Sequence, residues 1–558
     1  MKPLLRPLVS PALIICLSVA IAAAAGAAAP PPASAASIPP ALEARLASGS
    51  TAAGVPLLSL ESLRLFYRER EHRPAWTGSS LSPQIDVLMS ALRGADREGL
   101  RPADYHLAAI DAQLSRFRPA TSAANSTPGG DAADLDLLVS DAFFLYATHL
   151  TSGRVNPSSV EAEWNIAGRG RDLVFLLGSA LDRGHLAATI RDLAPVREDY
   201  RRLRGALASQ RAIAAAGGWP SVPGGPTLHP GDRGPRVAAL RRRLAATGEL
   251  PAGADTAGEL FDAQLADALR RFQLRHGLEP DALAGRRTIA AMNVTADRRA
   301  RQIEANLERL RWLPRDLGPR HLLVNIADFR LELTEEGSPT LAMRVIAGRL
   351  ARRTPFFTGE ITSILLNPSW TVPEKIAIED KLPLILDDPY YLEDHGFKVY
   401  EFSGKVWREI DPRKVDWTRV STDRFPYLLR QSPGPENALG RIKFQVPNRH
   451  DIYLHDTPSR SLFARTERTF SSGCIRVERA LDLAVRLLAA DPTWTRERIE
   501  TTIATGETVS VPLPGPMPVY LLYWTAWIDR DGLIQFREDV YGRDDATLEA
   551  LSQPVLAP

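Results

Sequence analysis

The sequence predicts a multidomain α+β protein with a mostly helical N-terminal scaffold, a small three-helix module, and a β-rich domain that carries an insertion. The chain has 558 residues, which is too long for one ordinary core. Apolar residues recur at helical spacing in the first half, whereas from about His321 they alternate with a period of two. The apolar share of 44% indicates a globular protein, and the net charge of +2 gives no case for binding nucleic acid.

The N-terminus predicts export. Lys2 and Arg6 come before an alanine-rich apolar run that ends near Ala29 and offers A-x-A cleavage sites. Residues 1–29 are interpreted as a signal peptide or as a retained anchor, because the run is nearly long enough to span a bilayer. Either interpretation predicts an exported protein, periplasmic or anchored in the inner membrane and facing the periplasm. An Ala/Pro linker, residues 30–40, follows.

Residues 41–220 are expected to form the helical scaffold, and nothing in them has a pattern typical of catalysis. The clearest helix is predicted over 135–150. There Leu138 and further apolar residues at helical spacing fall close to one face, whereas Asp136 and Asp141 are expected off that face.

Residues 228–294 predict three short helices. Gly231 and Gly234 mark a turn before the first helix, and Gly277 ends the second, which carries Phe272 and Gln273. With these residues in these places, the unit resembles the peptidoglycan-binding domain found beside many cell-wall enzymes. The resemblance implies glycan binding, with a spacer that has no ligand as the alternative.

The β-rich domain is expected over residues 320–512. A charged and aromatic stretch at about 374–435 is too long for a connection between strands, so we expect an inserted subdomain that caps the site. Residues 513–558 are predicted to be strands that pack on the catalytic or scaffold domain. The alternating aromatics of 519–527 favour a core strand over a surface that stacks on glycan, and 529–532 predict a hairpin turn.

Cys474 is the only cysteine outside the N-terminal apolar run, because Cys16 lies within that run. If the run is removed or stays in the membrane, an internal disulfide is excluded. Most free cysteines are small buried hydrophobes. The residues from Ser471 to Cys474 form a polar turn with a glycine, so the sequence favours a reactive thiol instead.

His455 is the candidate base for this thiol. Residues 451–455 alternate as a strand, which puts Tyr453 and His455 on the same face. A zinc site of His450, His455 and an aspartate is the rival hypothesis. It is disfavoured because the two histidines are an odd number of residues apart on that strand, and no HExxH or paired CxxC motif is present.

Two further features favour a thiolate at Cys474. Residues 477–490 are helical by pattern, so the cysteine is expected just before a helix N-terminus, whose partial positive charge favours the ionised thiol. The backbone amides of Gly473 and Cys474 are expected to form an oxyanion hole for a tetrahedral intermediate.

At these residues the chain resembles the L,D-transpeptidase (YkuD) catalytic domain. The resemblance is carried by His455 followed by Ser471-Ser472-Gly473-Cys474-Ile475-Arg476. The general family has His before the glycine and Asn two residues after the cysteine, where this chain has Ser472 and Arg476. The form seen here is that of the large YcbB-like branch, which also matches residues 367–373 and 433–440, the middle module, the scaffold and the insertion.

The resemblance implies roles for these residues. Cys474 would be the nucleophile, His455 the general base and acid, Asp456 an orienter through its backbone carbonyl, and Gly473 an oxyanion donor. Five residues would line the substrate site: Tyr453, Ser472, Arg476, Trp370 and Asn437.

The resemblance also implies the reaction. A cysteinyl thioester formed from one stem tetrapeptide would be resolved by the amine of a second, giving a 3→3 cross-link in cell-wall biogenesis. No cofactor and no metal are implied, and carbapenems would form thioesters with the cysteine. The implied partners are peptidoglycan stem peptides and glycan, and cell-wall synthases; the membrane enters only through an N-terminal anchor.

Other functions stay open. Water in place of the amine would make the same acyl-enzyme an L,D-carboxypeptidase or endopeptidase, and the sequence does not show which acceptor is used. Peptidases of the NlpC/P60 type are disfavoured, because there the cysteine comes before the histidine. A non-catalytic wall-binding scaffold would be expected to lose His455 or Cys474, and both are present.

Overall fold

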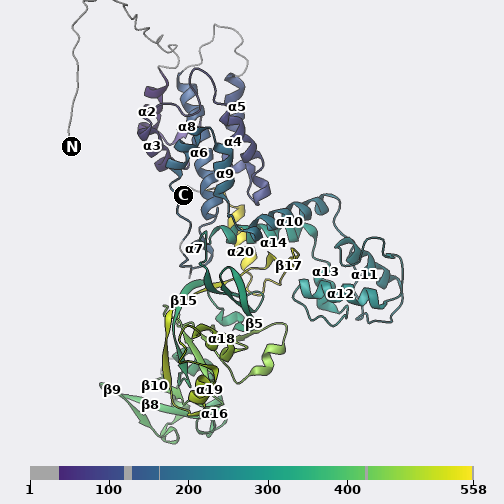
Figure 1. Ribbon diagram of the computed structural model, residues 1–558, viewed down its shortest axis with the longest axis vertical. Helices are drawn as coiled ribbons and strands as arrows, with labels where there is room; N and C mark the ends of the chain where they lie inside the picture. The colour runs from purple at the N-terminus through teal and green to yellow at the C-terminus, as the bar shows by residue number, and fades with distance from the viewer. Residues whose placement is uncertain (1–36, 118–128, 163, 167, 421–424, 556–558) are drawn as a thin grey trace, which may run out of the picture.

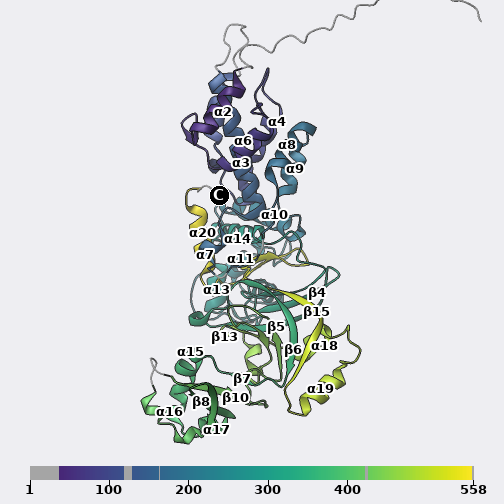
Figure 2. The ribbon, with the colours of Figure 1, turned by 90° about the vertical axis from the view of Figure 1, so that its left-hand side faces the viewer.

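The computed structural model describes residues 37–117, 129–162, 164–166, 168–420 and 425–555. The predicted signal peptide or anchor, and the linker up to residue 36, lie outside the described residues. The molecule is elongated, with the helical scaffold at one end, the β-rich domain and its insertion at the other, and the three-helix module projecting from the side (Figure 1). The view turned by 90° keeps this order along the long axis (Figure 2). Within the described ranges, no helix combines the length and the apolar character needed to cross a membrane.

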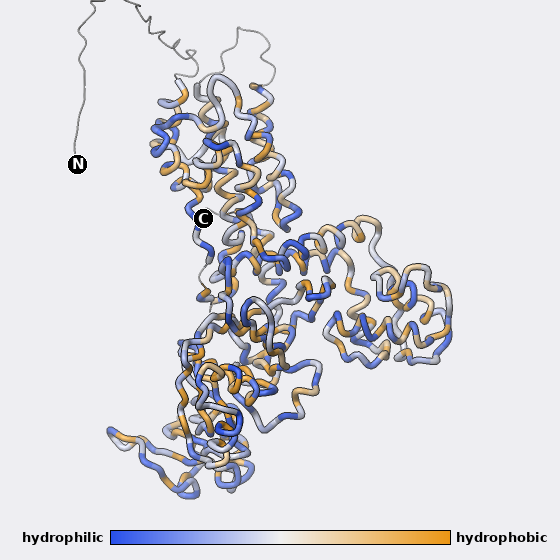
Figure 3. The backbone as a smooth tube through the Cα atoms, in the orientation of Figure 1, coloured by the Kyte–Doolittle hydropathy of each residue, from blue (hydrophilic) through white to orange (hydrophobic). Residues whose placement is uncertain are grey.

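The scaffold surrounds one long central helix, α6 (Gly129–Ser152). Hydrophobic and hydrophilic residues alternate along its helices (Figure 3). A small hairpin, β1 (Thr51–Ala52) and β2 (Val55–Pro56), lies among them. The other helices of the scaffold are α2 (Ile38–Ser48), α3 (Leu60–Glu69), α4 (Gln84–Arg93), η1 (Ala95–Glu98), η2 (Pro102–Tyr105), α5 (Leu107–Phe117), α7 (Pro157–Val160), α8 (Leu173–Arg183), α9 (Leu186–Leu193) and α10 (Glu198–Ala215).

Helix α6 is buried on nearly all sides, which corrects the prediction for two of its residues. Asp136 and Asp141 were expected off the apolar face, but both are 0% exposed. Asp136 accepts hydrogen bonds from the main-chain amides of Ala75, Trp76 and Thr77. Buried carboxylates are tolerated when such donors satisfy them, so these two residues tie neighbouring loops to the central helix.

The middle module has its own small core. It consists of α11 (Pro235–Ala246), α12 (Ala263–Arg275) and α13 (Arg286–Met292), packed around residues that include Val237, Leu265 and Phe272. Helix α14 (Ala296–Arg311) follows, outside the three helices predicted for this module. It packs against α10, α6 and the C-terminal helix α20 (Arg543–Ser552), so it lies where the scaffold meets the β-rich domain.

The β-rich domain is built on a nine-stranded sheet with the order β13-β5-β14-β12-β11-β6-β15-β3-β4. Strand β4 also pairs with β5, so the sheet closes on itself around a core of aliphatic and aromatic side chains. The strands are β3 (Arg320–Asn325), β4 (Arg330–Glu335), β5 (Ser338–Gly348), β6 (Phe357–Leu366), β11 (Ile442–Gln445), β12 (Leu454–His455), β13 (Thr469–Ser471), β14 (Ile475–Val477) and β15 (Val509–Leu522). Its helices are η3 (Leu350–Arg352), η7 (Arg460–Ala464), α18 (Ala480–Leu487) and α19 (Arg496–Ala504).

The insertion forms a subdomain with a separate four-stranded sheet of order β7-β10-β8-β9. Its own apolar core includes Trp370 and Phe397, and Tyr453 of the β-rich domain packs against that core. Its elements are β7 (Trp370–Thr371), α15 (Glu374–Ile376), η4 (Ala377–Lys381), α16 (Leu382–Asp387), α17 (Tyr391–Asp394), β8 (Phe397–Ser403), β9 (Val406–Ile410), η5 (Pro412–Lys414), η6 (Trp417–Arg419) and β10 (Tyr427–Gln431).

The C-terminal part differs from the predicted set of separate strands over 513–558. Strand β15 runs across the boundary at 512, because an irregularity in its pairing with β6 between Pro512 and Met517 lets it continue through a proline-rich stretch. The chain then forms a hairpin of β16 (Ala526–Ile528) and β17 (Ile534–Phe536) before helix α20. Tyr523 and Trp524 are buried in the core, which confirms the prediction that this aromatic stretch packs inward.

Candidate active site

Two short parallel strands bring the predicted site residues together. Leu454 of β12 pairs with Ile475 of β14, and His455 pairs with Arg476. Side chains at paired positions point to the same side of a sheet, so Tyr453 and His455 share one face with Cys474 and Arg476. We call this surface the catalytic face. The rings of Tyr453 and His455 are 5.6 Å apart between centroids, as expected from the strand pattern.

The strand that carries His455 is shorter than predicted. Residues 451–455 were expected to be extended, but β12 contains only Leu454 and His455. Asp451 has φ of 53°, and the Asn448 side chain accepts from the His450 amide and donates to the Ile452 carbonyl. This turn interrupts the alternation just before Tyr453, because a left-handed residue cannot continue a strand.

Cys474 is half-buried on the catalytic face, and its Sγ is 3.6 Å from the Asp451 carbonyl oxygen. Burial raises the pKa of the Cys474 thiol, and hydrogen bonding by Tyr453 together with the charges of Lys443 and Arg476 acts against that rise. A helix does form within the predicted range 477–490, but it does not begin directly after the cysteine. Residues 475–477 are strand β14 and α18 begins only at Ala480, so the helix terminus is too far away to favour the thiolate.

His455 is only 4% exposed, and its Nδ1 lies 2.6 Å from the Asp456 carbonyl oxygen. A carbonyl can only accept, so Nδ1 carries the hydrogen and Nε2 keeps its lone pair. Burial, with the charges of Arg476 and Lys443, lowers the pKa of His455 to about 3. The imidazole is therefore neutral at physiological pH.

The side chain and the main-chain carbonyl of Asp456 bind different groups. Its carboxylate accepts from the Arg441 amide and from Arg460 Nη1, both at 3.0 Å. Gly440 lies directly against it: a Cβ there would come within 2.5 Å of Asp456 Oδ2. The carboxylate thus fastens the adjoining loops while the carbonyl holds the imidazole, as expected for an orienter that acts through its backbone.

The turn before Cys474 is held by its own serine. The Gly473 amide donates to Ser471 Oγ at 3.1 Å, and Ser471 Oγ donates to the Cys474 carbonyl at 2.6 Å. Gly473 has φ of 119°, a conformation that favours glycine. The Gly473 amide already donates to Ser471, so the prediction that it is an oxyanion donor does not hold in this geometry. Of the two predicted donors, only the Cys474 amide is left for that role.

Two basic residues that were not predicted from the sequence border the catalytic face. Lys443 pairs with His455 across β11 and β12, and its Nζ is 3.8 Å from the centroid of the Tyr453 ring. Arg352 donates to Ser472 Oγ at 3.0 Å and to Asp380 of the insertion at 2.7 Å. Alternation along residues 442–446 predicts which face of its own strand Lys443 lies on. It does not predict the register with β12, and this register is what places Lys443 beside His455.

Comparison with protein families identifies the domains. Residues 319–510 match the L,D-transpeptidase catalytic domain (YkuD), residues 233–292 a putative peptidoglycan binding domain, and residues 61–207 a scaffold domain. The chain carries an L,D-transpeptidase catalytic domain of the YkuD type. Cys474 and His455 both fall within it.

Individual relatives agree with this assignment. A putative L,D-transpeptidase from Haemophilus influenzae is 38% identical over 243 residues, which cover 44% of this chain and 48% of that protein. The chain thus spans about half the length of this curated relative. Solved structures of L,D-transpeptidases overlap it only weakly: one from Stackebrandtia nassauensis has 13% identity, a TM-score of 0.19 and coverage of 54% and 96% of the two chains. One from Mycobacterium smegmatis has 12% identity, a TM-score of 0.18 and coverage of 36% and 58%.

The remaining predicted residues of the transpeptidase domain divide into two groups. Trp370 lies beside the Tyr453 hydroxyl, and Arg476 Nε is buried without a hydrogen-bond partner among the described residues, so both border the catalytic face. Asn437 does not. It is 1% exposed, and its side chain donates to the Ser432 carbonyl and accepts from the Leu439 amide, so it shapes a turn and cannot contact a substrate.

The geometry gives no support to the rival zinc hypothesis. The His450 ring lies against Phe357, whereas the His455 ring lies against Tyr453, so the two imidazoles face different neighbours. In the part of the chain that the structure describes, no group of three or more His, Cys, Asp or Glu side chains is placed to hold a metal ion.

Proposed function

We propose that this protein is a peptidoglycan L,D-transpeptidase that forms 3→3 cross-links between stem peptides through a thioester on Cys474. One observation carries the proposal: Cys474 and His455 share the catalytic face, and the Asp456 carbonyl accepts from Nδ1 of His455, which leaves the lone pair of the neutral imidazole on Nε2. Only a neutral imidazole can accept the thiol proton.

In the first step Sγ of Cys474 attacks the carbonyl of the third stem residue while its proton passes to Nε2 of His455. The oxyanion receives a hydrogen bond from the Cys474 amide. The bond to the terminal D-alanine then breaks, His455 returns the proton to the leaving amine, and a thioester remains. Burial keeps the resting thiol protonated, so we expect the thiolate to form only as the attack proceeds.

In the second step the side-chain amine of another stem attacks the thioester. His455 accepts a proton from that amine, the C–S bond breaks, and the released sulfur takes the proton back. Tyr453, Trp370, Ser472 and Arg476 line the approach in this proposal, and Arg476 and Lys443 offer positive charge to the carboxylates of the stem peptides.

We further propose that the insertion caps the bound stem peptide and that the middle module binds glycan. Contact between Tyr453 and the core of the insertion, and the ion pair of Arg352 with Asp380, support a cap that borders the catalytic face. Peptidoglycan as substrate implies an extracytoplasmic protein, which agrees with the export signal predicted for residues 1–29. Cell-wall synthases are the partners expected for such an enzyme.

The test is muropeptide analysis of purified protein incubated with disaccharide tetrapeptide. We expect a dimer with a 3→3 link and released D-alanine. A tripeptide product alone would show that water resolves the thioester and would replace the transferase by a carboxypeptidase. Incubation with a carbapenem should add the mass of one drug.

A further inference from the structure

We infer that Thr354 and Tyr541 are positioning residues that aim the Cys474 amide, and that they connect the catalytic turn to the C-terminal segment of the chain. The inference deepens the proposed function, since it rests on Cys474 as nucleophile. It starts from a hydroxyl that the mechanism above does not use.

Thr354 joins the catalytic turn to the end of strand β5. Its side chain is 0% exposed, and its Oγ1 donates to the Gly473 carbonyl at 2.7 Å. The same oxygen accepts from the Gly348 amide at 2.9 Å. Both hydrogen-bonding functions of this hydroxyl are therefore used, one of them on the residue that precedes the nucleophile.

This contact has a consequence for the oxyanion donor. The Gly473 carbonyl and the Cys474 N–H belong to one peptide group, which is planar and trans, so they point in opposite directions. While Thr354 holds the carbonyl on its own side, the N–H must point to the other side. Gly473, with φ of 119°, would otherwise leave this peptide group unusually free to rotate.

Tyr541 closes the loop that carries Thr354. Its hydroxyl donates to the Gly348 carbonyl at 2.5 Å and accepts from the Thr354 amide at 3.4 Å, so it binds both ends of the loop from 348 to 354. The same loop carries Arg352, which donates to Ser472. The catalytic turn is thus held by two side chains of one loop, and Tyr541 holds that loop.

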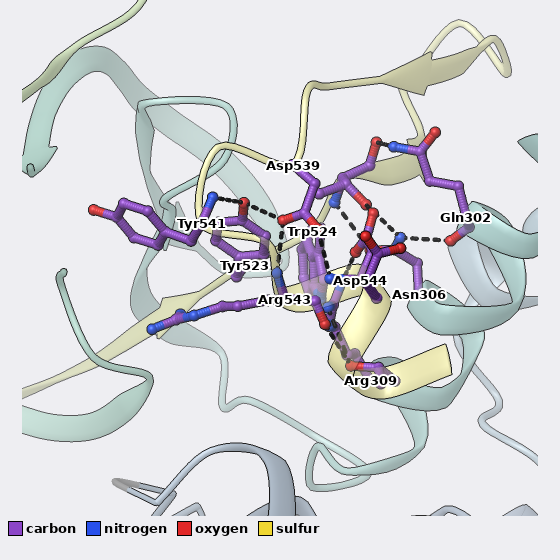
Figure 4. Close-up of polar contacts among 12 residues, drawn as sticks. Gln302, Asn306, Arg309, Tyr523, Trp524, Asp539, Tyr541, Arg543 and Asp544 are labelled. Atoms are coloured by element: carbon purple, nitrogen blue, oxygen red, sulfur yellow. Dashed lines mark hydrogen bonds and ion pairs between the residues drawn. The ribbon is translucent and has the colours of Figure 1, made fainter. Parts of the chain in front are cut away.

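Tyr541 is itself fixed by a chain of buried and half-buried polar groups, which Figure 4 shows. Its amide donates to the Tyr523 hydroxyl at 2.9 Å, and the two rings stack with centroids 5.6 Å apart. The Tyr523 hydroxyl donates to Asp539 at 2.6 Å, and Asp539 accepts from the Asp544 amide. Asp544 pairs with Arg309 of α14 at 2.5 Å. Contacts therefore run without a break from the catalytic turn to the helix that packs on the scaffold.

The test compares two reactions of the same thiol in full-length protein. Acylation by p-nitrophenyl acetate passes through an oxyanion, whereas alkylation by iodoacetamide does not. Thr354→Val removes the hydroxyl and nearly keeps the shape, and Tyr541→Phe removes only the phenol oxygen. Thr354→Ser restores the hydroxyl. Tyr520→Phe is the matched control, since Tyr520 lies in β15 and its hydroxyl donates to Leu317 instead.

For both Thr354→Val and Tyr541→Phe we expect acylation to fall at least about tenfold while alkylation stays within about twofold, because a mis-aimed donor affects only the oxyanion. Thr354→Ser and Tyr520→Phe should behave like wild type in both reactions. Unchanged acylation in Thr354→Val, or an equal fall of both reactions, would overturn the inference. The ester assay needs no stem peptide. Failure to cross-link peptidoglycan would therefore overturn the proposed function, whereas the comparison of acylation with alkylation would still test the role of Thr354 and Tyr541.

Discussion

Two buried histidines, one in the scaffold and one on the catalytic face, have similar protonation and different surroundings. His149 of α6 is 5% exposed and His455 is 4% exposed, and burial lowers the pKa of each to about 3. Nδ1 of His149 bonds the Tyr105 hydroxyl inside a packed aromatic cluster. Nδ1 of His455 instead donates to the carbonyl of Asp456, and the residue lies on a face that also carries a thiol.

The buried carboxylate of Asp136 in the scaffold also differs from the polar groups of the catalytic face. It is satisfied by main-chain amides and by the Tyr67 and Thr77 hydroxyls, as a structural group in a core must be. On the catalytic face Arg476 Nε lacks a partner in the described structure, and Lys443 rests on an aromatic ring. A perturbed pKa alone therefore does not mark a site. Polar groups with unused hydrogen-bonding capacity, gathered on one face, do.

The largest expected effect separates the two histidines. His455→Gln should lower the rate of acyl transfer by at least about 10²-fold, because it removes the base. His149→Gln is the matched control, and its folded protein should keep the wild-type rate. Rates measured under substrate saturation decide this, with circular dichroism to confirm folding. Equal loss of activity in both variants would remove the distinction between a structural and a catalytic histidine.

Lys443→Met should have the next largest effect and lower the rate of acylation about tenfold. This is the size of effect expected from removing one nearby charge in a partly buried site. The physical reason is that Lys443 favours the ionised form of the Cys474 thiol, so its loss should move the pH profile of alkylation to higher pH. Lys414→Met, on the exposed η5, is the control. A profile that does not move would exclude Lys443 from the electrostatics of the thiol.

Asp456→Asn should change little in acylation, less than about threefold, because the backbone carbonyl that orients His455 remains. The loss of the ion pair with Arg460 should lower the melting temperature slightly, since the partner is largely exposed. A fall in rate as large as that of His455→Gln would show that the carboxylate acts in catalysis.

Acid should weaken both regions in the same way. Each histidine has a folded pKa of about 3 and an unfolded value near 6.5, so the unfolded state binds more protons between these values. The contribution to the free energy of unfolding is complete above pH 6.5 and is lost as the pH falls toward 3. Urea unfolding at pH 7, 5 and 4 measures this loss, which His149→Gln and His455→Gln should each reduce. No reduction would mean that the two imidazoles are already charged in the folded protein.

The sequence was sufficient to predict the structure where a local pattern of residues decides it. Alternation predicted the strands of the β-rich domain and put Tyr453 and His455 on one face. It was insufficient where distant segments meet. The register of β11 with β12 brings Lys443 to the site, and the donors from other loops make a buried Asp136 acceptable. The helix expected over 477–490 begins only at Ala480, because pairing with β5 and β12 makes residues 475–477 a strand.

The most direct test of the account is to trap the acyl-enzyme. Wild-type protein and Cys474→Ala are incubated with an N-acetylated stem tetrapeptide in the absence of an acceptor amine, then digested and mapped by mass spectrometry. The account predicts a thioester on the peptide that contains Cys474, with one equivalent of D-alanine released by wild type and none by Cys474→Ala. Release of D-alanine by the alanine variant, or an adduct on another residue, would contradict it.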